Sequence, residues 1–237
     1  MDADSVQTVL ARCRQSRQNN ERIRELLPTT AAASLRANFA RSAIDLSLEH
    51  HSALARVTEA GEYGTAGALL RPILEAATAA FWFVYAATCD EIRALPTTVI
   101  DNPPQDIPGL ADMLKVLIPT FPHIQMMADG LRAGGSAKWL HKYAHGGTPQ
   151  LTRRGAQGWS EGEVILTLIR ADLFSTLAAS VETVIAPNAP LFAYVFGTRD
   201  ELAAEFQTDF GGQPIPPQPH GHPVAPLLAD GCGLPFG

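Results

Sequence analysis

The feature of this sequence that most restricts its fold is an uncharged run of 14 residues, from Ala76 to Cys89. The run is rich in alanine and aromatic residues, and polar and apolar side chains do not alternate along it, so it favours a helix over a strand. A helix that crosses a membrane needs about 20 apolar residues. A buried core helix is therefore the better interpretation, and we predict an all-α fold.

Periodic apolar residues and helix breakers divide the remaining chain into further helices. Proline or glycine ends several of them, and Ser160 with Glu163 has the pattern of a capping box at a helix start. We expect helices over residues 5–27, 31–60, 65–94, 109–118, 136–145, 160–185 and 199–206, and a loop over residues 148–159. This pattern predicts a single helical bundle of about five to seven helices over residues 1–210. A proline- and glycine-rich tail follows over residues 211–237.

The third expected helix carries a charged pair in apolar surroundings. Arg71 and Glu75 are four residues apart and share one helix face, and leucine, alanine and aromatic residues flank that face. We predict that buried Arg71 pairs with Glu75 or binds an anionic group, because an unpaired buried charge is strongly destabilising. Pro72 removes one backbone hydrogen bond, so we also predict a kink at this proline.

A second segment that could carry chemistry contains two histidines on one expected helix face. They are spaced four residues apart and are accompanied by two lysines: Lys138, His141, Lys142 and His145. Another histidine pair, His50-His51, is expected to lie at the surface or to serve packing.

Three interpretations of His145 stay open. It could be a structural histidine that caps its helix and bonds the Arg71–Glu75 pair, or a general acid–base group at the end of the helix. It could also share a metal with His141 and Glu75, but the segment lacks the glutamate of the HExxH metalloprotease motif. We therefore predict no metal site and take Arg71, Glu75 and His145 as the candidate catalytic residues.

The chain between residues 130 and 160 is positively charged. It contains no acidic residue but five basic ones, although the formal net charge of the protein is −6. Glycines at its centre allow the backbone to turn with its amides outward, as in anion-binding loops. We predict an anion-binding site here, and a solvated basic loop is the alternative. Its residues would be Lys138, His141, Lys142, Gly146, Gly147, Arg153 and Arg154.

Other sequence features bear on cofactors, location and partners. No phosphate-loop motif and no nucleophile motif is present, so we predict no cofactor. The acidic start Met1-Asp2-Ala3-Asp4 differs from a signal peptide, and we expect a cytoplasmic protein that does not associate with a membrane. The expected partners are a second copy of the chain in a homodimer and an anionic small molecule or RNA.

The segments GALLRPILEA, AATCDEI and YAHGGTPQLTRR together resemble an uncharacterised family of bacterial helical proteins, classed as a domain of unknown function. The resemblance covers roughly residues 65–154. It maps its motifs onto Arg71, Glu75, Trp82, His145, Gly146 and Arg153. The family has no established activity, so the resemblance implies a helical architecture rather than a reaction.

Two classes of function remain. The first is a binding or interaction protein in which Arg71, Glu75 and His145 form an internal polar constellation, and we prefer it because buried ion pairs often only specify packing. The second is an enzyme of bacterial defence or stress with His145 as acid–base, either ribonuclease-like or acting on another phosphate substrate. The ribonucleases of small helical bundles carry their arginine and histidine on one helix, whereas Arg71 and His145 belong to different expected helices.

Overall fold

The computed structural model describes residues 1–95, 106–125, 140, 142–145, 147–154 and 158–210, and all the regular secondary structure in them is helical. Its five long helices are α1 (Ala3–Leu26), α2 (Leu35–Glu59), α3 (Tyr63–Tyr85), α9 (Glu161–Ile185) and α10 (Ala189–Phe210). The short ones are α4 (Cys89–Ala94), α5 (Leu110–Leu117), α8 (Thr148–Thr152) and the 3-10 helix Pro122–Ile124. The predicted all-α bundle is confirmed, and the short helices bring the number in the described chain above the expected range.

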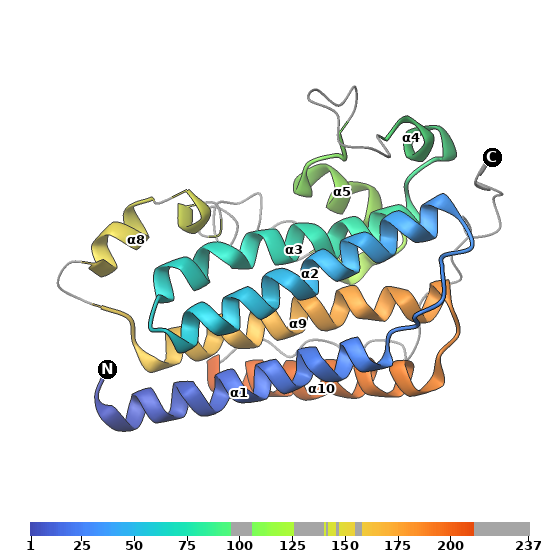
Figure 1. The fold of residues 1–237 in the computed structure, drawn as a ribbon. Coiled ribbons are helices and arrows are strands. Elements are labelled where there is room, and N and C mark those ends of the chain that lie inside the picture. The colour runs from blue at the N-terminus through green and yellow to red at the C-terminus, as the bar shows by residue number, and fades with distance from the viewer. Residues whose placement is uncertain (96–105, 126–139, 141, 146, 155–157, 211–237) are drawn as a thin grey trace.

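The long helices lie side by side in one bundle (Figure 1). α2 and α3 are joined by a tight turn at Gly61, whose φ of 80° suits glycine, and they pack against each other most extensively. α9 contacts each of the other four long helices, so it occupies the centre. α8 lies near the start of α3, whereas α4 and α5 lie near its end (Figure 1).

Two apolar clusters fill the bundle. The larger surrounds the second half of α3 and includes Trp82, Phe83 and Tyr85 together with residues of α2, α5 and α10. The smaller surrounds the first half of α3, where Leu70 and Ile73 pack against α1 and the start of α9. The candidate sites described below lie close to the smaller cluster.

Several helix bounds differ from those expected. The third helix ends at Tyr85 rather than near residue 94, because Thr88 and Glu91 form a capping box that starts α4. Helix α3 continues through Pro72, and the kink at this proline stays a prediction. The expected loop over residues 148–159 contains α8, and α10 begins ten residues before the expected residue 199. The capping box of Ser160 and Glu163 is present as predicted.

Two helices, α3 and α9, are long and apolar enough to cross a membrane, and 67% of the most apolar window of each is buried in the bundle. Core helices of soluble proteins have the same length and composition, so this property does not separate the two classes. The tail over residues 211–237 lies outside the described residues.

Candidate functional site

The Arg71–Glu75 pair forms on α3, but at the surface rather than in the core. Arg71 Nε lies 2.7 Å from Glu75 Oε1, and the two side chains are 29% and 38% exposed. The expected burial is therefore wrong. Leu70, Ile73 and Leu74 take the buried positions of this turn, which leaves the charged face at the edge of the bundle.

Only part of the histidine segment can be placed. Lys138, His141 and Gly146 lie outside the described residues, while Lys142 and His145 are exposed. The buried side chains here are Leu140 and Tyr143. The apolar and aromatic side chains of Leu140 and Tyr143 thus anchor the segment to the bundle.

Tyr143 joins this segment to the first half of α3. A Cβ added at Gly67 would lie only 2.7 Å from Tyr143 Cδ1, so the absence of a side chain at Gly67 makes the contact possible. Gln150 Nε2 donates to the carbonyl oxygen of Gly64 at 3.0 Å and also to that of Tyr143. The segment therefore meets α3 at Gly64 and Gly67, about two turns and one turn before Arg71.

Arg153 connects the same segment to the start of α9. Its Nε donates to the Tyr143 hydroxyl at 3.1 Å, its Nη1 donates to Glu163 Oε2 at 2.6 Å, and its guanidinium lies 5.1 Å from the ring centroid of Trp159. Partial burial opposes the charge of Arg153, but Tyr143 and Glu163 outweigh it and raise the pKa of Arg153. Its donors are engaged within the protein, so Arg153 holds the segment in place.

A cavity of about 510 Å³ opens beside these contacts, at the first turn of α3. We call it the α3 cavity. Its described lining comes from the α2–α3 turn and from the segment around α8: Gly61, Glu62, Tyr63, Gly64, Thr65, Gln150, Arg153, Arg154 and Trp159. Of the predicted site residues, the structure brings Arg153 and Arg154 together here, whereas Arg71, Glu75, Lys142, His145 and Gly147 are not among its described lining residues.

The positive charge of this cavity comes from Arg154 and from the helix itself. Arg154 is exposed and makes no hydrogen bond or ion pair with a described residue, and its Nη2 would lie 3.9 Å from a Cβ at Gly64. No described side chain caps the start of α3, so the amides of Tyr63, Gly64 and Thr65 keep their N–H groups available. Glu62 adds one carboxylate at the rim.

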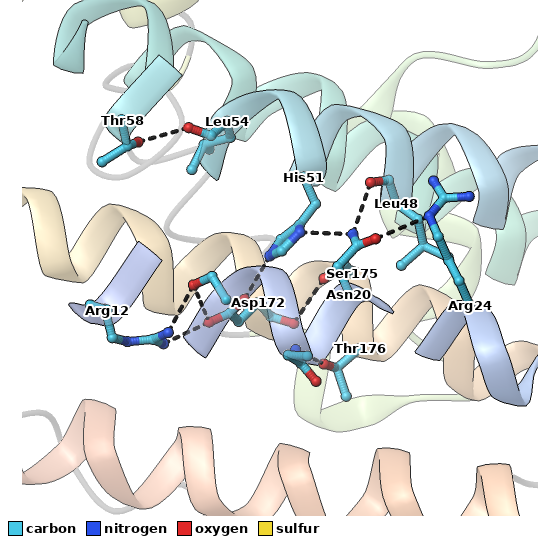
Figure 2. A network of polar contacts seen from close by, with 12 residues as sticks. Arg12, Asn20, Arg24, Leu48, His51, Leu54, Thr58, Asp172, Ser175 and Thr176 are labelled. Atoms are coloured by element: carbon cyan, nitrogen blue, oxygen red, sulfur yellow. Dashed lines mark hydrogen bonds and ion pairs between the residues drawn. The ribbon is translucent and has the colours of Figure 1, made fainter. Parts of the chain in front are cut away.

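A second polar cluster lies inside the bundle, and the sequence analysis missed it. His51 of α2 is fully buried between Asp172 of α9 and Asn20 of α1 (Figure 2). His51 Nε2 is 2.6 Å from Asp172 Oδ1, and His51 Nδ1 is 2.8 Å from Asn20 Nδ2.

The neighbours of Asn20 fix the proton of His51. Arg24 Nε can only donate, and it contacts Asn20 Oδ1 at 3.0 Å, so the other amide atom of Asn20 is the nitrogen. That nitrogen donates to the carbonyl oxygen of Leu48 at 2.9 Å and to His51 Nδ1. Nδ1 must then be an acceptor, and the neutral ring donates its Nε2 proton to Asp172.

Arg12 of α1 balances the charge of Asp172. Arg12 Nη2 lies 2.7 Å from Asp172 Oδ2 in an ion pair, although the two groups are not aligned as a hydrogen bond. Ser16 completes the link, because it accepts from Arg12 Nη1 at 2.8 Å and donates to Asp172 Oδ2 at 2.9 Å. We call Arg12, Ser16, Asn20, His51 and Asp172 the internal lock, because they join three helices without reaching the surface.

Most of the chain matches the model of one protein family. Residues 44–208 match the model of a family of unknown function, DUF6988. The chain belongs to this family. The prediction of an uncharacterised domain family is thereby confirmed. No curated protein and no solved structure matches the chain.

The match to DUF6988 includes one candidate site as far as it is described and the other only in part. It contains the whole described lining of the α3 cavity, and it contains His51 and Asp172 of the internal lock. Helix α1, which supplies Arg12, Ser16 and Asn20, lies outside the matched residues.

The structure also shows which signals in the sequence were overlooked. Gly64 and Gly67 stand three residues apart on one face of a helix, a spacing that permits close approach of another segment. Arg12, Ser16, Asn19 and Asn20 occupy buried positions of α1, and their spacing of three to four residues could have indicated a polar contact face.

Proposed function

We propose that this DUF6988 protein is a binding protein that takes a small anionic ligand into the α3 cavity. The observation that carries the proposal is the position of Arg154. Its guanidinium lies beside Gly64, where the first turn of α3 has no side-chain cap. A helix start of this kind attracts anions through its free N–H groups and its partial positive charge.

Of the two arginines among the described lining residues, Arg153 is engaged within the protein and Arg154 is left for a ligand. Arg153 is paired with Glu163, and that pair also fixes the capping box of α9. The pKa of Glu163 lies below its ordinary value, because bonds from Ser160 and the charge of Arg153 outweigh its partial burial. Arg153 therefore forms part of the cavity lining and is held there by Glu163. Arg154 is the cation whose charge a ligand would neutralise.

Binding is favoured over catalysis by the residues of the cavity. None of its described lining residues is a histidine, a serine or a cysteine, and His145 is exposed elsewhere on the segment. The ribonuclease-like alternative needs His145 beside the reacting group. The internal lock provides no substitute, because His51 is sealed from solvent and both ring nitrogens are already bonded.

A cytoplasmic setting and a homodimeric assembly are further parts of the proposal. Size-exclusion chromatography with light scattering measures the assembly directly. A single species at the 25.4 kDa mass of one chain would contradict the dimer and leave the cavity unaffected.

The proposal is tested with inorganic phosphate as the probe, by isothermal titration at constant ionic strength. Arg154→Gln removes the cation that has no partner among the described residues and should weaken phosphate binding about tenfold, the loss expected for one charged hydrogen bond. Arg93→Gln is the matched control, since Arg93 is 57% exposed on α4 near the other end of α3 (Figure 1). Equal phosphate affinity in all three proteins, or no saturable binding at all, would contradict an anion site here.

A further inference from the structure

The α3 cavity has an aromatic corner in addition to its positive side. Tyr63 and Trp159 both line the cavity, their ring centroids are 6.4 Å apart, and the rings are tilted by 56°. Arg153 and Tyr143 hold Trp159 from within the protein, at 5.1 Å and 5.4 Å from its ring centroid. A simple inorganic anion would leave this partly exposed aromatic surface unused.

Glu62, the acidic residue of the described cavity lining, can make a third kind of contact. Glu62 is exposed at the start of α3 and lies next to the amides proposed to receive the anion. A carboxylate at this position opposes a nearby anion, so Arg154 and the helix start must outweigh it, and it accepts hydrogen bonds from hydroxyl groups. The cavity therefore combines an anion subsite, a hydroxyl subsite and an aromatic subsite.

We infer that the ligand of the α3 cavity is a nucleoside 5′-monophosphate. Its phosphate binds Arg154 and the first amides of α3, its ribose hydroxyls donate to Glu62, and its base packs against Tyr63 and Trp159. The inference rests on the proposed anion site and adds the chemical class of the ligand. The volume of about 510 Å³ falls within the range of small-molecule pockets, about 300–1,000 Å³.

Comparing AMP, ribose 5-phosphate and inorganic phosphate separates this inference from the proposed function. Affinities are measured by equilibrium dialysis with radiolabelled ligands. Stacking of a base on an aromatic ring should make AMP bind at least about tenfold tighter than ribose 5-phosphate. Arg154→Gln should weaken all three ligands, because each carries the phosphate.

Variants at the aromatic corner identify the base contact. Trp159→Leu should remove the preference for AMP over ribose 5-phosphate and leave the affinity for phosphate within twofold. Tyr63→Leu is the second variant, in case the loss of Trp159 unfolds the segment, and circular dichroism monitors folding of both. Phe192→Leu is the matched control, because Phe192 is an aromatic residue of α10 that is 38% exposed and outside the described cavity lining.

The outcomes distinguish the two claims. Equal binding of AMP and ribose 5-phosphate, with both weakened by Arg154→Gln, overturns the nucleotide inference and leaves the anion site standing. Binding of none of the three probes overturns both. Tighter binding of a short single-stranded RNA than of AMP overturns the inference in favour of a polymer ligand. A preference for AMP that both aromatic variants retain also overturns it.

Discussion

Arg24 determines the protonation state of His51 through Asn20, without contacting the histidine ring itself. Arg24 fixes the orientation of the Asn20 amide, and Asn20 in turn makes Nδ1 of His51 an acceptor. The ring is therefore neutral and donates to Asp172, whose charge is balanced by Arg12. Single side chains here act through their neighbours, so their contributions to stability should be coupled.

The first prediction concerns the charge balance of the internal lock. Asp172→Asn removes the nearer carboxylate of buried Arg12, at 2.7 Å, and leaves Glu205 at 3.5 Å, so it should lower the free energy of unfolding by about 3–5 kcal/mol. Adding Arg12→Gln to Asp172→Asn should cost less than the two single changes together. Urea unfolding monitored by circular dichroism gives the three values.

Asp90→Asn is the control for this cycle, because Asp90 is 98% exposed and its ion pair with Arg93 is long, at 3.6 Å. It should change stability by less than about 1 kcal/mol. Strict additivity of Arg12→Gln and Asp172→Asn would show that the lock does not act as a unit.

The second prediction concerns pH. Burial alone would raise the pKa of Asp172, but the contacts with His51, Arg12 and Ser16 outweigh it and place the pKa below the ordinary value of 3.8. The unfolded chain therefore takes up this proton at higher pH than the folded chain. The stabilisation is complete above the unfolded pKa and disappears as the pH falls through the folded one.

Urea titrations between pH 5 and pH 2 should thus show a steeper loss of unfolding free energy in the wild type than in Asp172→Asn. Identical slopes in the two proteins would mean that Asp172 has the same pKa in the folded and unfolded chains.

At the scale of elements, the helices could be read from the sequence more accurately than their contacts. The capping box of Ser160 and Glu163 predicts the start of α9, and Pro28 and Gly61 predict the ends of α1 and α2. The break after Tyr85 and the helix at Thr148 were missed, although Thr88 with Glu91 and proline after Thr148 are both helix-start patterns.

The candidate site was harder to predict because its contacts join distant parts of the chain. Gln150 bonds Gly64 across 86 residues, and His51 bonds Asp172 across 121. Residue type and spacing identified Arg153 and Arg154 as anion-site residues, but they gave no indication that Glu163 engages Arg153. The Arg71–Glu75 spacing predicted the pair correctly, whereas its depth depended on which face of α3 the other helices cover.

The third prediction tests the junction of α3 with the segment around Tyr143. Gly67→Ala places a Cβ 2.7 Å from Tyr143 Cδ1 and 3.3 Å from Trp159 Cη2, so it should destabilise the protein by about 1–3 kcal/mol. Thermal unfolding provides the measurement.

Gly197→Ala is the matched control within a helix. A Cβ there meets nothing within 4 Å, so the higher helix propensity of alanine should stabilise α10 by about 0.5–1 kcal/mol. A stabilising Gly67→Ala would contradict the close approach of Tyr143 to α3.

At the scale of the whole molecule, the bundle separates a sealed polar region from an open one. The internal lock attaches α1, which lies outside the family match, to α2 and α9. The α3 cavity lies at the first turn of α3, where Arg154 makes no bond with a described residue. Changes in the lock should therefore alter stability with little effect on ligand affinity, and changes at Arg154 should do the reverse.

The central claim is that the start of α3 receives an anion, and an NMR titration with inorganic phosphate tests where the anion binds. We expect saturable shifts of the Tyr63, Gly64 and Thr65 amides that disappear in Arg154→Gln and persist in Arg93→Gln. Absence of saturable shifts at these three amides, or equal shifts along the whole of α3, would contradict it.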